Sequence, residues 1–137
     1  MRYVLIPLLL LAGPWTSHVQ AQKKDVEIQQ RWRGSVADTK LMKLAPQVIA
    51  SQKKLEGVWK DWKIAGDPPA VDFKKNLVVV ATWRGSSFNP IVTLDEKGNL
   101  AVGGFGTEDL RPGFRFVLAV ISREGVVTVN GKKLPDE

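Results

Sequence analysis

Glu108 and Asp109 are the candidate acid–base pair of this sequence, because both carboxylates lie in a segment that reads as a loop. A glycosidase needs two carboxyl groups, roughly 5 to 9 Å apart, that face the same substrate bond. Adjacent residues of an extended loop usually point apart, and Arg111 is placed to neutralise one of them. We therefore expect a structural salt bridge here, with a carboxylate-dependent hydrolase as the less favoured alternative.

The first 21 residues have the composition of a secretory signal peptide. Met1-Arg2 supplies a positive start, Val4 to Ala12 an apolar run, and Val19-Gln20-Ala21 a small-x-small cleavage site. The apolar run is shorter than the ~20 residues that cross a bilayer, which disfavours an uncleaved anchor. We predict cleavage after Ala21, and a secreted or periplasmic chain that forms a single domain from residue 22 to 137.

Cleavage would remove the lone histidine, His18, and the lone tyrosine, Tyr3, and the chain has no cysteine. A mature chain without these residue types cannot build a Ser-His-Asp triad, a Cys-His pair or the common zinc sites. None of its lysines lies in an obviously apolar segment that would lower its pKa. We therefore predict a non-enzymatic, disulfide-free protein with no catalytic residue, no metal and no cofactor.

The chain is basic, with a formal net charge of +6 that falls by one if Arg2 is removed. A basic surface favours anionic partners such as acidic glycans or cell-wall polymers, and such binding weakens as salt screens the charges. Nucleic acid is not an expected partner of a secreted protein. The simplest explanation of the surplus charge is solubility alone.

Two loop ends are the favoured sites of partner contact, because each lies beside glycine and combines an aromatic side chain with polar and basic ones. Ordinary hairpin loops are the alternative interpretation. The candidate partner-binding residues are Arg84, Ser86, Ser87, Phe88 and Asn89 in the first loop end, and Phe105 and Arg111 in the second.

The tetrapeptide Trp-Arg-Gly-Ser occurs twice, at Trp32–Ser35 and at Trp83–Ser86. The flanking residues do not match, which argues against a duplicated domain. We expect both copies to mark strand ends, where tryptophan packs and Gly-Ser turns the chain. The alternative is that Arg33 and Arg84 emerge at one end of the sheet as an anion-binding rim.

These loops must be positioned by a small set of strands and one helix. Asn76 to Gly85 contains a continuous apolar run, typical of a strand that is buried on both faces. Val26 to Arg33 alternates between apolar and polar residues like a half-exposed strand that ends at Gly34-Ser35. Gln52 to Ile64 has helical spacing of its large apolar residues, with Ser51 as its N-cap and Gly66 as its end. These apolar residues are Leu55, Val58, Trp59 and Trp62.

The second half of the chain is rich in strand and turn signals. Gly98 and Asn130-Gly131 suit hairpin turns, Phe114 to Ser122 reads as a strand, and Gly103–Gly106 suggests a bulge or bend. Residues 36–46 are ambiguous. We predict an α+β fold: a mostly antiparallel sheet of five to seven short strands with one amphipathic helix packed on one face.

The span from Leu55 to Leu134 resembles a group of small bacterial secreted proteins, and more distantly the C-terminal domain of PrcB-type proteins. The resemblance rests on four segments: Trp59-Lys60-x-Trp62, Pro69–Phe73, Arg84-Gly85-Ser86 and Leu110–Arg115. PrcB-type proteins are associated with stabilising a cell-surface protease complex. The resemblance implies a protein partner in the cell envelope, and anionic polymer is the alternative partner.

Overall fold

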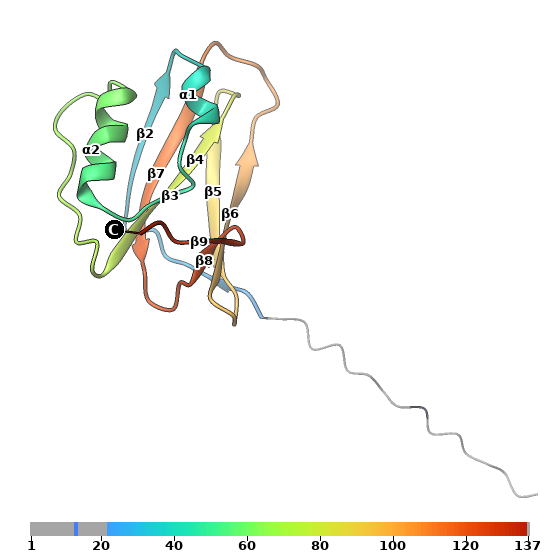
Figure 1. Ribbon diagram of the computed structural model, residues 1–137. Helices are drawn as coiled ribbons and strands as arrows, with labels where there is room; N and C mark the ends of the chain where they lie inside the picture. Colours follow the sequence, from blue (N-terminus) through green and yellow to red (C-terminus); the bar gives the residue numbers. More distant parts are fainter. Residues whose placement is uncertain (1–12, 14–21, 137) are drawn as a thin grey trace, which may run out of the picture.

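The computed structural model describes Gly13 and residues 22–136. The predicted signal peptide lies outside these residues apart from Gly13 and stays a prediction. The described chain forms two β-sheets packed face to face, with helix α2 (Gln52–Asp61) against the outer face of one of them (Figure 1). The predicted α+β class with mostly antiparallel strands is confirmed. None of the helices described has the length and apolar character needed to cross a membrane.

The sheet beneath α2 has four strands in the order β2-β7-β4-β3, all antiparallel. Their bounds are Gln30–Val36, Phe114–Ser122, Asn76–Trp83 and Val48–Ile49. The other sheet has five strands in the order β1-β5-β6-β8-β9, of which only β6 and β8 pair in parallel. Their bounds are Lys24–Asp25, Phe88–Leu94, Asn99–Gly106, Thr128–Val129 and Lys132–Lys133.

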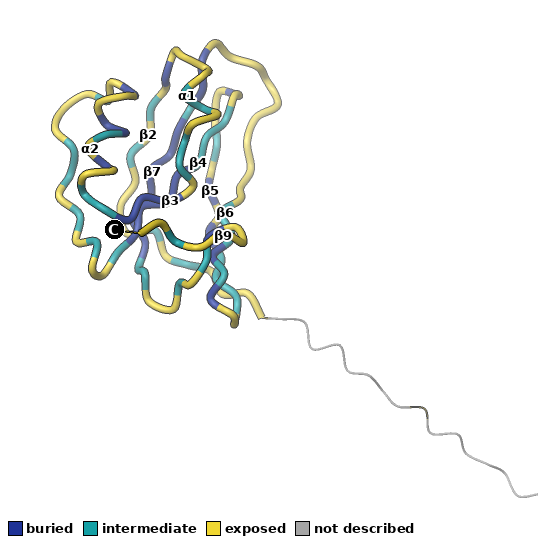
Figure 2. Tube along the Cα trace, viewed as in Figure 1, coloured by how far each residue is buried: buried dark blue, intermediate teal, exposed yellow. Residues whose placement is uncertain are grey.

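Strand β4 is buried on both faces, as its apolar run predicts. Val78 and Val80 pack towards α2, whereas Leu77 and Val79 pack towards the second sheet. A single sheet was expected, but the β5–β6 hairpin folds across the face that α2 leaves open. Apolar residues of this hairpin, such as Val92, are buried there and complete a second core layer. Figure 2 shows that burial is concentrated in β4 and β7, the two inner strands of the four-stranded sheet, which have a core layer on each face.

Helix α2 begins where predicted, since the Ser51 hydroxyl accepts a hydrogen bond of 3.3 Å from the Lys54 amide. It ends earlier than predicted, at Asp61, because Lys63 has a positive φ of 52° that breaks the helical path before Gly66. Trp59 and Trp62 are both buried against the sheet, as expected for the helix's apolar stripe. The ambiguous segment 36–46 contains one short helix, α1 (Lys40–Lys43).

Two expectations about the strands are wrong in detail. The alternating segment from Val26 does not form one strand, because the chain crosses from β1 in one sheet to β2 in the other. The glycines from Gly103 to Gly106 form no bulge either, since β6 stays in register with β5 as far as Gly106. A side chain at Gly106 would overlap the ring of Trp83, at 2.4 Å. The glycine is needed for this close approach.

Candidate functional site

The two Trp-Arg-Gly-Ser segments meet at one end of the sandwich. Strands β2 and β4 both end there, beside the long loop that joins β6 to β7 (top of Figure 1). Between them lies a hollow of about 320 Å³, which we call the arginine hollow. It is lined by Arg33, Gly34, Ser35, Ser86, Ser87, Phe88, Arg115, Phe116 and Val117.

The register of the four-stranded sheet explains why these side chains gather. Ser35 on β2, Arg115 on β7 and Trp83 on β4 are direct neighbours across the strands, so their side chains share one face. Arg33 lies two residues before Ser35 and faces the same way. This is the face turned towards the second sheet. The core between the sheets therefore becomes polar and basic at this end.

Arg33 connects the edges of the two sheets. Its Nη1 donates to the carbonyl oxygen of Phe88 at 2.9 Å, and its Nη2 donates to Oδ1 of Asn89 at 3.1 Å. A guanidinium group has five N–H donors, so more than half of them are left for a ligand. Arg33 is exposed and can reach such a ligand.

Arg115 has hydrogen-bonding capacity left as well. Its Nη2 donates to the carbonyl oxygen of Pro112. Its Nε is buried and has no partner among the described residues. A buried N–H without an acceptor is costly, so an oxygen atom brought into the hollow would be favoured there. No carboxylate lines the hollow, and its two cations are thus not neutralised from within.

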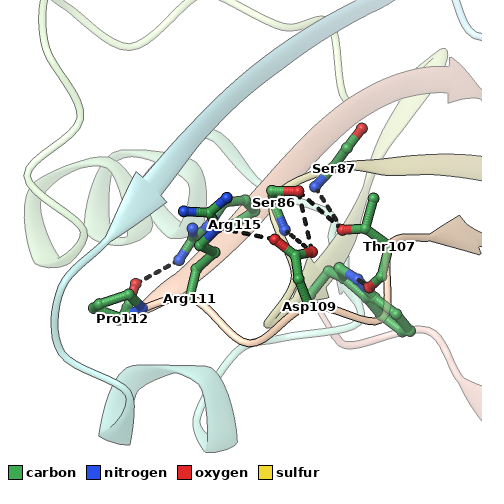
Figure 3. Close-up of polar contacts among 8 residues, drawn as sticks. Ser86, Ser87, Thr107, Asp109, Arg111, Pro112 and Arg115 are labelled. Carbon is green, nitrogen blue, oxygen red and sulfur yellow. Dashed lines mark hydrogen bonds and ion pairs between the residues drawn. The ribbon is translucent and has the colours of Figure 1, made fainter.

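Asp109, whose carboxylate bonds to Ser86 of the lining, is held by the loops themselves (Figure 3). Its Oδ1 accepts from the backbone amide and the hydroxyl of Ser86 at 3.0 and 3.1 Å, and its Oδ2 accepts from Nε of Arg111 at 2.9 Å. Hydrogen bonding by the Thr107 side chain, the Ser86 amide and Arg111 holds the pKa of Asp109 far below its ordinary value. The predicted loop salt bridge is confirmed, and it joins Asp109 to Arg111.

Further contacts join the β4–β5 and β6–β7 loops into one unit. Trp83 donates from Nε1 to the carbonyl oxygen of Thr107 at 2.7 Å, and its ring stacks on Phe88 with centroids 5.3 Å apart. The amide of Ser87 donates to the hydroxyl of Thr107 at 3.2 Å. The two loop ends that were singled out in the sequence therefore lie side by side.

The predicted partner-binding residues do not all share one site. Ser86, Ser87 and Phe88 line the arginine hollow, and Asn89 holds Arg33 at its edge. The remaining three lie outside it. Arg84 accepts, through its carbonyl oxygen, a hydrogen bond of 3.0 Å from the Arg111 amide, and Phe105 is a 75% exposed side chain on β6.

Sequence reasoning missed Ser35 and Arg115 in the lining of the hollow. It also missed Thr107, which lies outside the lining and bonds to Ser86 and Ser87. The repeated tetrapeptide was the available signal in the sequence, because Arg33 of the first copy and Ser86 of the second copy line the same hollow. Arg33 and Arg84 lie at the same end of the sandwich, as the alternative interpretation required, but they do not line one hollow. Arg84 lies outside the hollow, and Arg115 takes the corresponding place because the register sets it beside Ser35.

A second hollow, of about 340 Å³, lies on the other face of β2. We call it the tryptophan hollow, after Trp32, Trp59 and Trp62 in its lining; Gly34 and Phe116 also contribute. Trp32 and Trp59 meet edge to face with ring centroids 6.1 Å apart. Strand β2 therefore runs between a basic hollow on one face and an aromatic hollow on the other.

The outer edge of β2 is open. It is the terminal strand of its sheet, and among the described residues no other strand pairs with it beyond β7. Arg123 at the end of β7 donates to Lys75 beside β4, so odd-numbered residues of β7 bond towards β4 and even-numbered ones towards β2. By the same alternation, Arg31, Arg33 and Ser35 direct their backbone N–H and C=O groups to the open side.

A comparison of the sequence with protein-family models gives no match, and comparisons with curated proteins and with solved structures give none either. Within the part of the chain that the structure describes, no three His, Cys, Asp or Glu side chains are grouped to hold a metal ion. The arginine hollow, the tryptophan hollow and the open edge between them are therefore the features from which a function can be argued.

Proposed function

We propose that this chain is a non-enzymatic extracytoplasmic domain that binds or stabilises a partner protein, and that it does so by pairing β2 with an extended segment of that partner. In strand addition, main-chain hydrogen bonds supply affinity and hollows for alternate side chains supply specificity. The observation that carries the proposal is the position of β2, which has an open edge between two hollows on opposite faces.

The contrast with the second sheet supports this choice of edge. β5 is flanked by β1 at one end, where Val92 accepts a hydrogen bond from the Val26 amide. The backbone groups of Pro90 point to the same outer edge as those of Val92. Proline has no N–H to offer there, which is a common protection of edge strands. Further along, Arg33 occupies the carbonyl oxygen of Phe88. The edge of β5 is thus closed in three ways, whereas β2 has no such protection on its backbone.

The resemblance to PrcB-type domains suggests a class of partner, a protease complex of the cell envelope. Secretion through the predicted signal peptide would bring the chain to that compartment. Cleavage would also remove His18 and Tyr3 from a chain that has no cysteine. The chemistry left to the mature chain favours binding over catalysis, which supports the non-enzymatic assignment.

The test uses two variants of one residue. Arg31→Pro removes the outward N–H of β2 together with a charge, whereas Arg31→Gln removes only the charge. Since that N–H makes no bond to β7, both variants are expected to fold, which thermal unfolding would check. The purified proteins are used to capture partners from an envelope extract of the cells that produce the chain. We expect Arg31→Pro to capture less of the partner than Arg31→Gln does, because only the proline variant lacks the outward N–H; equal capture by both variants would contradict strand addition.

Binding of an anionic glycan or cell-wall polymer is the second candidate function. The observation that favours it is the pair of arginines without a carboxylate in the arginine hollow, on a chain of net positive charge. The same capture experiment at low and at high salt separates the two. A polymer held by charge is released as salt rises, whereas a paired strand is retained because its backbone hydrogen bonds and buried side chains are little screened.

A further inference from the structure

We infer that the segment that pairs with β2 alternates acidic and apolar residues, with the acidic side chains in the arginine hollow and the apolar ones in the tryptophan hollow. The inference rests on the proposed strand addition and goes further, because it states the chemistry by which the partner would be recognised.

The side chains of an added strand alternate between the faces of the sheet, as those of β2 do, and they lie roughly 4.8 Å from their neighbours on β2. Every second residue of the partner would therefore lie beside Arg31, Arg33 and Ser35. The residues between them would lie beside Trp32 and Gly34. The two faces of β2 differ in chemistry at each of these positions.

The first face selects acidic side chains. Arg31 and Arg33 are exposed and point to the same side, and Arg115 lies beside Ser35 at the end of the same row. Arg33 and Arg115 keep guanidinium donors without a partner among the described residues, including the buried Nε of Arg115. A carboxylate matches the planar donor geometry of a guanidinium group. Asp109 does not compete, because it is held by Ser86 and Arg111.

The second face selects apolar side chains. The lining of the tryptophan hollow includes three tryptophans, Phe116 and Ile64, and its charged members are Lys63 and Arg33. Gly34 lets the Phe116 ring lie against the backbone of β2, since a Cβ at Gly34 would come within 2.7 Å of that ring. An aliphatic side chain of the partner would be packed against these rings and removed from water, which favours binding.

A second copy of this chain is not the expected occupant. If two β2 strands paired antiparallel about their centres, Arg33 would face its own counterpart and Arg31 would lie opposite Ser35, with four arginines on one face. Like charges directly opposite are destabilising. The arginines therefore act against self-pairing, as charged residues on edge strands commonly do, while they favour an acidic partner.

The experiment measures the affinity of the purified protein for capped peptides of about seven residues, the length of β2. The four peptides alternate valine with glutamate, valine with glutamine, valine with lysine, and serine with glutamate. We expect the valine–glutamate peptide to bind about tenfold tighter than the valine–glutamine and serine–glutamate peptides, and the valine–lysine peptide to bind most weakly.

The charge preference is then reversed in the protein. In the exposed pair Arg31→Glu/Arg33→Glu, the valine–lysine peptide should bind best, and in Arg31→Gln/Arg33→Gln the preference for the acidic peptide should shrink to what Arg115 alone supplies. The inference is overturned if the acidic peptide has no advantage over its glutamine or serine counterpart, if the order survives the charge reversal, or if no peptide binds.

The proposed function is judged separately, by Arg31→Pro against Arg31→Gln. If valine peptides of any charge bind equally well and are lost only in Arg31→Pro, strand addition stands and the charge pattern is wrong. If the acidic peptide is preferred but binds both variants equally, strand addition is wrong and a polyanion site remains.

Discussion

Arg33 on the edge of one sheet donates a hydrogen bond of 2.9 Å to the carbonyl oxygen of Phe88 on the edge of the other sheet. The neighbouring Nη2 of the same side chain reaches Asn89 at 3.1 Å. One side chain thus joins the two layers at the end of the sandwich where both Trp-Arg-Gly-Ser segments lie. The two hydrogen bonds also hold the guanidinium group of Arg33 in the lining of the arginine hollow.

A double-mutant cycle at Arg33 and Asn89 would measure this link. We expect Arg33→Gln to lower the free energy of unfolding by about 1 kcal/mol, since the bonds are exposed, and Asn89→Ala to lower it by less. The double variant should lose less than the sum, by about 0.5 kcal/mol, because each substitution removes the same hydrogen bond. Urea unfolding followed by fluorescence measures all four proteins. Strict additivity would show that the contact contributes nothing to stability.

The same substitution should have opposite effects at two glycines, Gly34 and Gly57. A Cβ at Gly34 would lie 2.7 Å from the buried ring of Phe116, so Gly34→Ala should destabilise the protein by roughly 1 to 3 kcal/mol. A Cβ at Gly57 within α2 meets nothing within 4 Å, so Gly57→Ala should stabilise it by about 0.5 to 1 kcal/mol. Denaturant midpoints of the two variants provide the comparison. A loss of stability in both would contradict the assignment of Gly34 to a packing role.

The sequence predicts those elements whose cause is local. The helix at α2 follows from its cap and apolar spacing, and the turn at Gly98 follows from its positive φ of 83°. The division into two sheets depends on how the β5–β6 hairpin folds over β4, a long-range contact that no local pattern encodes. The arginine hollow depends on register for the same reason. Arg115 reaches Ser35 only because β7 pairs with β2, 80 residues away in sequence.

Asp109 should make the stability of the protein depend on pH. Its pKa in the folded state lies far below the ordinary value of 3.8, so the ionised carboxylate favours folding above that pH. The contribution is lost as the pH falls from 3.8 towards the folded-state pKa. Asp109→Asn should therefore lower the thermal midpoint at neutral pH, and the difference from the wild type should shrink in acid.

Glu108→Gln is the matched control for this titration, since the neighbouring Glu108 makes no hydrogen bond or ion pair among the described residues. Its thermal midpoint should follow that of the wild type across the pH range. The interpretation would be wrong if Asp109→Asn differed from the wild type by the same amount at about pH 3 and at neutral pH, because a purely steric effect does not titrate.

Alanine substitutions at two glycines of β6, Gly106 and Gly103, should distinguish the loss of the close contact with Trp83 from a general effect of alanine on the strand. A Cβ at Gly106 would lie 2.4 Å from the indole of Trp83, whereas a Cβ at Gly103 meets nothing within 4 Å. Gly106→Ala should displace the indole from Phe88 and from its hydrogen bond to Thr107, at a cost of roughly 1 to 3 kcal/mol. Because that indole links the β4–β5 loop to Thr107, the arginine hollow should loosen as well. The near-ultraviolet circular dichroism of the aromatic residues should change in Gly106→Ala and remain unchanged in Gly103→Ala. Identical spectra and stabilities for the two variants would show that the ring does not need the space that Gly106 leaves.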